Sequence, residues 1–321
     1  MKKNNIIAIA AIALTFTACS NDNDFTTNNE GKDTPISLSV GVGELSVVTR
    51  AESGTTTPLT TGALGLYITK NGEKTLQGKY LCNNAKFTAS NTDTGTSWTC
   101  NTTYYWASDN ATINYFAYFP FQETEGTAAT SLPWDTSTQT GVGGGGYDPL
   151  DLLYVKSSAT NSADNHSIKI TLGHACSKLV VNVSKLGSEI ASGTISSIKI
   201  GGLKAQGNFY LLADTNNQID AGSWKPDVNP ADIVMKSTTT NANMNSTYEA
   251  ILIPQTAAFT LTISLSNNSE YQLAVPSHTF EAGTCYTLTI QVGQDKVNLG
   301  SITQTDWVPG NSGDDNHLTA Q

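Results

Sequence analysis

Hydrophobic and small or polar residues alternate near the start of the chain. Four aliphatic residues recur at every second position: Ile36, Leu38, Val40 and Val42. This period is typical of a β-strand with one buried face and one exposed face. The apolar run continues to Val48, and Arg50 and Ala51 follow, ahead of a segment rich in Thr, Ser and Gly. Such a segment is typical of an exposed loop, which a trypsin-like protease can cut after Arg50.

Two interpretations of this stretch stay open. In the first, residues 36–48 form an ordinary first strand, and the loop behind it happens to contain an arginine. In the second, the strand is buried in a precursor and is removed by the cut, as polymerisation by strand exchange requires.

Short strand-like segments recur along the rest of the chain, with turn-forming residues between them and no convincing long helix. The clearest segments are 63–69, 113–119, 168–172, 178–183, 195–200, 259–265 and 286–292. Because sequential strands separated by turns favour antiparallel pairing, the pattern predicts all-β antiparallel sandwiches rather than a parallel α/β sheet.

The N-terminus is typical of a bacterial lipoprotein signal. Lys2 and Lys3 precede the apolar stretch 6–16, and small residues lead to Cys19. We expect residues 1–18 to be removed and Cys19 to be acylated, which anchors the chain in membrane lipid. Simple secretion, with Cys19 lost or irrelevant, is the alternative. Beyond the N-terminus, no stretch is apolar for long enough to span a bilayer.

Shifts in composition predict the domain organisation. The Ser-, Ala- and Asn-rich stretch 156–166 is the best candidate for a domain boundary. The expected order is a signal peptide (1–18), a flexible tether (19–35), an N-terminal β-sandwich domain (36–160, first strand 36–48), a C-terminal β-sandwich domain (167–308) and a polar tail (309–321).

The overall charge excludes one class of partner. The net charge is −10 and the pI is about 4.7. Nucleic-acid binding needs clustered Lys and Arg, so we expect no nucleic-acid partner. A charged fraction of 14%, with abundant Thr, Ser, Asn and Gly, is typical of a secreted or surface β-protein.

Four further cysteines are candidates for disulfides in an exported chain: Cys82, Cys100, Cys176 and Cys285. The natural pairs are Cys82 with Cys100 and Cys176 with Cys285, one in each expected domain. The sequence does not choose among the three connectivities, and buried free thiols are an equal expectation.

No pattern of catalytic or cofactor-binding residues is present. The four histidines lie apart, and His174 is expected to be a packed structural residue. The Gly141–Gly146 run lacks the ending of a phosphate-binding loop, and Asp148 and Asp151 are not part of a calcium-binding loop. We therefore expect no enzyme, no cofactor and no metal.

Several aromatic residues are candidates either for a glycan-binding platform or for the N-terminal core, with the core favoured for most of them. They are Trp98, Tyr104, Tyr105, Trp106 and Trp134.

A series of motifs resembles the fimbrillins of Bacteroidales, also called type V pilins, including the Mfa-like members. In chain order the matching stretches are Val48–Ala51, Tyr104–Trp106, Tyr115–Pro120, Asp151–Tyr154, His174–Leu179, Ile198–Gly202, Ile253–Thr256, Phe280–Tyr286 and Ile302–Trp307. Each motif is short, so the resemblance rests on their order across nearly the whole chain behind a lipoprotein signal.

The resemblance implies two transthyretin-like antiparallel β-sandwich domains in tandem and assembly into a cell-surface fimbria that supports adhesion. It implies a lipoprotein precursor at the outer membrane, held by acylated Cys19 and cut between Arg50 and Ala51 by a trypsin-like or Arg-specific protease. Loss of the strand carrying Ile36 and its alternating partners opens a groove, which a segment of another fimbrial subunit fills.

The segment 297–308 is the candidate donor strand of this chain. If it folds into its own domain instead, the molecule suits a tip subunit better than a shaft subunit. The competing function is a non-polymerising surface lipoprotein that binds a glycan or a host or bacterial ligand through loops and exposed aromatics.

Overall fold

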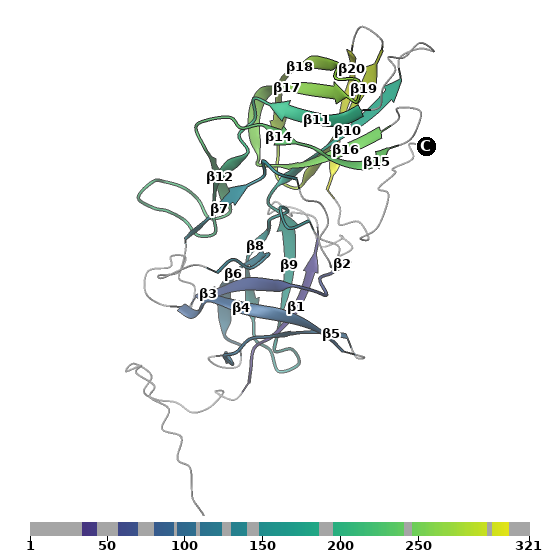
Figure 1. Cartoon of the computed structure of the whole chain (residues 1–321). Helices are drawn as coiled ribbons and strands as arrows, with labels where there is room; N and C mark the ends of the chain where they lie inside the picture. Colours follow the sequence, from purple (N-terminus) through teal and green to yellow (C-terminus); the bar gives the residue numbers. More distant parts are fainter. Residues whose placement is uncertain are drawn as a thin grey trace, which may run out of the picture. The chain divides into compact units, whose positions relative to one another are not determined.

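The computed structural model describes residues 34–43, 57–69, 80–92, 95–106, 110–123, 130–139, 148–185, 195–240, 246–293 and 297–307. The described residues form twenty strands and no helix, which confirms the predicted all-β fold (Figure 1). Accordingly, no membrane-spanning helix occurs in the described part of the chain.

The strands of the first half are β1 (Ser37–Val42), β2 (Thr57–Pro58), β3 (Ala63–Thr69), β4 (Tyr80–Thr92), β5 (Gly95–Thr99), β6 (Thr112–Phe119), β7 (Ser131–Asp135), β8 (Leu153–Thr160) and β9 (Ser167–His174). Those of the second half are β10 (Ser177–Lys185), β11 (Ile195–Gly201), β12 (Gln206–Tyr210), β13 (Ser223–Pro226), β14 (Ile233–Val234), β15 (Lys236–Thr240), β16 (Ser246–Leu252), β17 (Gln255–Leu265), β18 (Glu270–Phe280), β19 (Thr284–Val292) and β20 (Val297–Asp306).

The strands of the first half form one long sheet in the order β2-β1-β9-β8-β6-β3-β4-β5. β8 and β9 are joined by only two residue pairs, Leu153 with His174 and Tyr154 with Gly173. On either side of this narrow junction, β1 and β9 share a hydrophobic core with β3, β4 and β6. The sheet therefore closes into a β-sandwich, with alternating residues of each strand directed into its core.

The second sandwich packs two sheets on another core. A five-stranded sheet, β15-β16-β10-β19-β20, supplies buried side chains such as Val181 and Leu288. A four-stranded sheet, β14-β11-β17-β18, supplies Ile198 and Leu261. Most pairs are antiparallel, as the sequence predicts, but β1 with β9 and β10 with β19 are parallel. These partners lie far apart in the chain, so a long crossover connection can bring them side by side in the same direction.

A third core joins strands of the two halves. Strand β7 pairs with β12, which in turn pairs with β13. The inward side chains of this small sheet, including Leu132 and Phe209, share a core with Tyr67 and Tyr118 of the first sandwich and Ile251 of the second. The polypeptide segments of the two halves are thus interleaved rather than linked only by a connecting loop.

The placement of β9 differs from the expected domain limits. The sequence pattern assigns residues from 167 onward to the second domain, whereas Ile168, Ile170 and Leu172 lie in the first core beside β1. The chain passes to the second sandwich through Ala175 and Cys176, where β9 ends and β10 begins. Local composition could not indicate that β9 belongs to the first sandwich, because its partner strand β1 lies about 130 residues earlier in the sequence.

Candidate functional site

The first strand is bound to the sheet mainly along one edge. β1 runs parallel to β9 over six consecutive pairs, from Ser37 with Ser167 to Val42 with Leu172 (Figure 1). The Gly43 N–H extends this ladder by donating to the Leu172 carbonyl at 2.9 Å. On the opposite edge, β2 pairs only with Gly41 and Val42. A complete ladder to β9 therefore holds β1, together with further hydrogen bonds at the two ends of the strand.

The alternation along β1 is an alternation of burial. Ile36, Leu38, Val40 and Val42 are at most 9% exposed, while Ser37 and Ser39 face solvent. The neighbouring strand contributes three fully buried side chains: Ile168, Ile170 and Leu172. At about 1.5–3 kcal/mol for each buried aliphatic side chain, the four side chains from residues 36–42 supply several kcal/mol of gross stabilisation.

A short aromatic segment, Tyr104–Trp106, holds the beginning of the first strand. The Ile36 N–H donates to the Tyr104 carbonyl at 2.8 Å, and the Trp106 N–H donates to the Thr34 carbonyl at 3.1 Å. The Trp106 indole is buried and donates to the His166 carbonyl at 2.9 Å, just before β9. Sequence reasoning missed this role, and the only signal for it was three consecutive aromatic residues outside a clear strand.

The contacts of β1 define what its removal would leave. Without it, the N–H and C=O groups along one edge of β9 lose their partners, and the core loses one wall. An unpaired edge beside an apolar trough is a template for another extended segment. We call this region, lined by Ile168, Ile170, Leu172 and the Tyr104–Trp106 segment, the β1 groove.

Three residues of the predicted processing scheme lie outside the described residues: Cys19, Arg50 and Ala51. The described chain stops at Gly43 and resumes at Thr57, so the expected cut falls between β1 and β2.

The four cysteines of the described chain are free thiols in the structure. Cys82 is buried and donates to the Leu66 carbonyl at 3.3 Å, while Cys176 is buried near the Leu150 carbonyl at 3.7 Å. Burial raises the pKa of the Cys82 thiol to about 12, and it also raises the pKa values of Cys176 and Cys285. These three thiols therefore stay protonated at neutral pH and are poor nucleophiles.

Alkaline pH is expected to destabilise the reduced protein. The unfolded chain releases the Cys82 proton near pH 9, whereas the folded chain keeps it until about pH 12. In this window the unfolded state binds fewer protons, so the free energy of unfolding falls by at most about 1.4 kcal/mol per pH unit for this thiol. Urea unfolding between pH 8 and pH 11, with a reductant present, measures the slope.

The matched variant for this measurement is Cys82→Ala, which removes the titrating group and is expected to make the slope shallower. An unchanged slope in the variant would contradict the assignment to Cys82. If the slope of the wild type becomes shallower without reductant but the slope of Cys82→Ala does not change, oxidation of Cys82, as in the predicted Cys82–Cys100 disulfide, is indicated.

A buried polar pair lies where the first sandwich meets the second. His174 Nδ1 and Asp151 Oδ2 are 2.8 Å apart, and the two side chains are 3% and 4% exposed. The Trp307 ring stacks on the imidazole, with ring centroids 4.0 Å apart and planes 5° from parallel. His174 is thus a packed residue, but the sequence did not indicate that Asp151 and Trp307 are its partners.

The last described strand lies at the edge of the second sandwich. β20 pairs antiparallel with β19, and the Trp307 N–H then donates to the Gly283 carbonyl at 2.8 Å. Only Val297 and Ile302 of β20 pack partly against the core, and most other residues of the strand are exposed. The candidate donor segment is therefore folded, through Trp307, into its own sheet.

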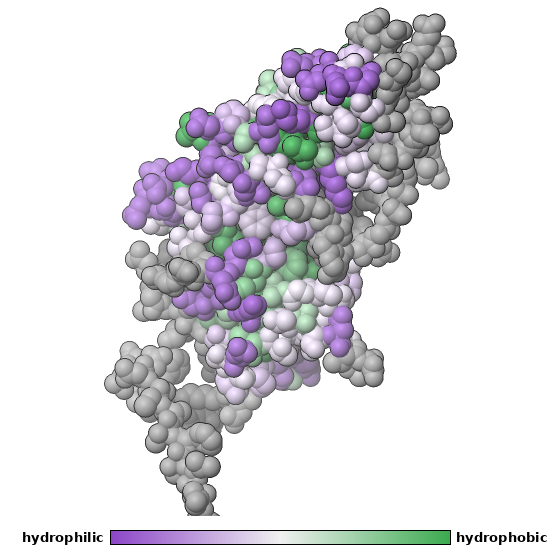
Figure 2. Space-filling model, in the orientation of Figure 1, coloured by the Kyte–Doolittle hydropathy of each residue, from purple (hydrophilic) through white to green (hydrophobic). Residues whose placement is uncertain are grey.

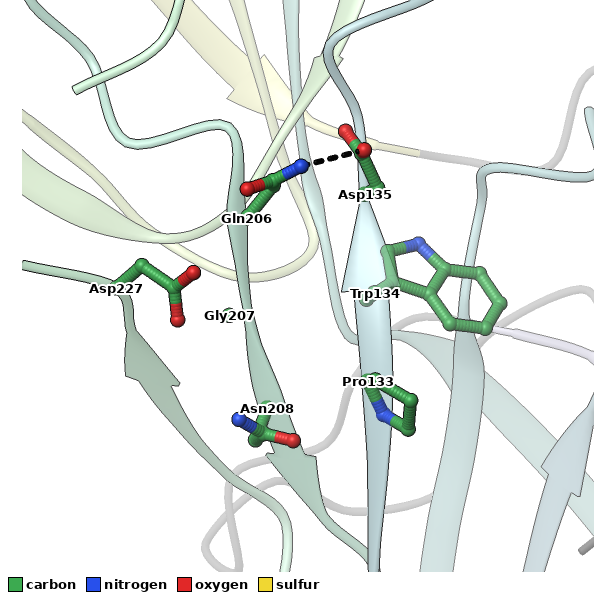
Figure 3. A pocket seen from close by; sticks show the side chains of 7 residues that line it. All are labelled: Pro133, Trp134, Asp135, Gln206, Gly207, Asn208 and Asp227. Atoms are coloured by element: carbon green, nitrogen blue, oxygen red, sulfur yellow. Dashed lines mark hydrogen bonds between the residues drawn. The ribbon is translucent and has the colours of Figure 1, made fainter. Parts of the chain in front are cut away.

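Most of the proposed platform aromatics lie in the cores. Trp98, Trp106 and Trp134 are buried, and Tyr105, at 45% exposed, is the most accessible of the set. Figure 2 shows hydrophilic residues gathered over the upper part of the view, and hydrophobic and weakly polar residues mixed over its middle and lower part. A pocket of about 310 Å³ lies over β7 and β12, but its Trp134 ring points away from Asp227 and Asn208 (Figure 3). The Trp134 indole donates instead to the Leu150 carbonyl at 2.9 Å.

The model of one protein family, described as fimbrillin-like, matches residues 49–307 of this sequence. The chain belongs to the fimbrillin-like family. This confirms the resemblance seen in the motifs and supports a role as a fimbrial or cell-adhesion subunit. The matched region of this fimbrillin-like chain begins one residue before Arg50, so β1 lies ahead of it.

Solved structures show the same fold. A putative cell adhesion protein from Bacteroides uniformis aligns with a TM-score of 0.61 and 20% identity, over 86% of this fimbrillin-like chain and 99% of its own. A putative cell adhesion protein from Bacteroides ovatus has the same TM-score and coverage at 14% identity. No curated protein sequence matches the chain.

Proposed function

We propose that this fimbrillin-like chain is a structural subunit of a cell-surface fimbria. It is exported as a lipoprotein, cut after Arg50 and assembled by donor-strand exchange, and the fimbria supports adhesion. The observation that carries the proposal is the position of β1. A single strand closes an apolar groove and lies just ahead of the expected cut. It is held by a complete ladder to β9 and, at its two ends, by β2 and the Tyr104–Trp106 segment.

The distribution of arginine supports the cut. Arg50 is the single arginine among the 17 Lys and Arg residues of the chain. An Arg-specific protease therefore has one site in the entire sequence, and a cut there separates β1 from all but the first two residues of the region that matches the family. A trypsin-like protease would also recognise the lysines, so we infer that the processing partner is Arg-specific.

In this scheme the precursor is located at the cell surface. We propose that acylated Cys19 anchors it in the outer membrane, because several acyl chains on one cysteine bind lipid firmly. The cut after Arg50 releases the two sandwiches from this anchor. We place their junction at Ala175–Cys176, where the chain leaves β9. Other fimbrial subunits are the partners after processing.

The first test is the state of the protein on its native cell surface. Intact mass, N-terminal sequencing and gel filtration are expected to show chains that begin at Ala51 in large, heat-resistant assemblies. Such assemblies dissociate slowly, because an inserted strand must lose all its pairs and its buried side chains before it leaves. A monomer that begins at acylated Cys19 would overturn the strand-exchange proposal and favour a non-polymerising binding lipoprotein.

A further inference from the structure

The C-terminal strand is a poor match to the groove that the proposed processing would open. The groove takes four aliphatic side chains at alternate positions of one strand, as residues 36–42 show. Over 297–308, no set of four alternate positions holds more than two aliphatic residues. Two sets reach two: Val297 and Leu299 with Ser301 and Thr303, and Ile302 and Val308 with Gln304 and Asp306.

The geometry of β20 points the same way. Its ladder with β19 has an irregularity between the pairs of Leu288 and Ile290, which interrupts the two-residue alternation near Gly300 and Ser301. Leu299 and Ile302, three residues apart, therefore pair opposite Ile290 and Leu288. A regular strand parallel to β9 would place Leu299 and Ile302 on opposite faces, so only one of them could enter the groove.

The residue that follows β20 also makes contacts within its own molecule. The Trp307 ring stacks on His174, and the Trp307 N–H donates to the Gly283 carbonyl. His174 in turn is paired with Asp151 in a buried site. Withdrawal of β20 as a donor would break its ladder with β19, remove this stacking and expose the polar pair to solvent.

We infer that this chain accepts a strand but does not donate one. Its partner is a different chain that carries a strand with aliphatic residues at four alternate positions, rather than a second copy of itself. This inference rests on the proposed strand exchange and also gives the place of the subunit in the polymer, which is at its end. Its β1 groove joins it to the next subunit, and its β20 stays in its own sheet.

The experiment uses the full chain, cut at Arg50 with an Arg-specific protease, and three synthetic peptides. The peptides are residues 34–48, residues 297–308, and residues 297–308 with Ser301→Val and Thr303→Val. Exchange of each peptide for the cut N-terminal fragment is followed by mass spectrometry, and self-association is followed by light scattering.

The 34–48 peptide is expected to bind at least about 100-fold more tightly than the 297–308 peptide, because two fewer aliphatic side chains are buried by the latter. The doubly substituted peptide is expected to recover most of this difference. The cut chain alone is expected to stay monomeric.

Two different failures can be told apart. If the cut chain polymerises alone, or if the 297–308 peptide binds within tenfold of the 34–48 peptide, this chain can donate to itself and the inference falls while strand exchange stands. If no peptide exchanges with the cut fragment at any concentration, the groove does not accept strands, and the proposed function falls together with the inference.

Discussion

Cells that carry Arg50→Ala are expected to display the precursor at full length and to form no fimbriae from it. Without the cut, residues 34–43 stay covalently attached and keep filling the β1 groove, so a strand from another subunit has no vacant edge to pair with. The tethered strand competes at a high effective concentration that a separate chain does not match. The amount of this chain in heat-resistant multimers on gels measures the loss.

Arg50→Lys separates the two classes of protease. A trypsin-like enzyme accepts lysine, whereas an Arg-specific enzyme does not, so the lysine variant is expected to behave like Arg50→Ala. Lys169→Ala, which changes an exposed basic residue of β9, serves as the control and is expected to process normally. Wild-type amounts of the Arg50→Ala chain in heat-resistant multimers would show that removal of β1 is not needed for assembly.

Val42→Asp is expected to destabilise the precursor by at least about 3 kcal/mol, because it places a carboxylate in a fully buried position with no compensating charge. Ser39→Asp adds the same group to the exposed face of the same strand and is expected to change stability by less than about 0.5 kcal/mol. Urea unfolding of the two uncut variants and the wild type measures the difference.

The same pair of variants tests whether β1 is dispensable after processing. Once the cut fragment has been replaced by the wild-type 34–48 peptide, Val42→Asp and wild type become identical proteins and should unfold at the same urea concentration. A persistent difference would mean that the fragment is not released, and that β1 remains a permanent part of the sandwich.

The local alternation of hydrophobic and polar residues was sufficient to predict much of the fold. Alternation at Ile36–Val42 predicted a strand with one buried face, and the structure confirms that face. Segments such as 259–265 and 286–292 were recognised in the same way and lie in β17 and β19. Strand character is a local property, because it depends on which side chains fit a half-buried pleated surface.

Partners across the sheet could not be predicted in this way. The parallel pairing of β1 with β9 joins residues about 130 positions apart, and no local signal marks it. The Asp151, His174 and Trp307 cluster has the same origin, since a loop, the last residue of β9 and the residue after β20 supply one residue each. The motifs that resemble fimbrillins identified the family without indicating these contacts.

The direction of β1 has a mechanical consequence. A strand in this position, running parallel to β9 over six pairs, would carry a pulling force along its own axis. Tension would then load the whole ladder in shear, so the pairs share the force and must break together, whereas a force across the strands would open them one at a time. The ladder that makes the first strand replaceable is therefore also suited to resisting drag on a filament.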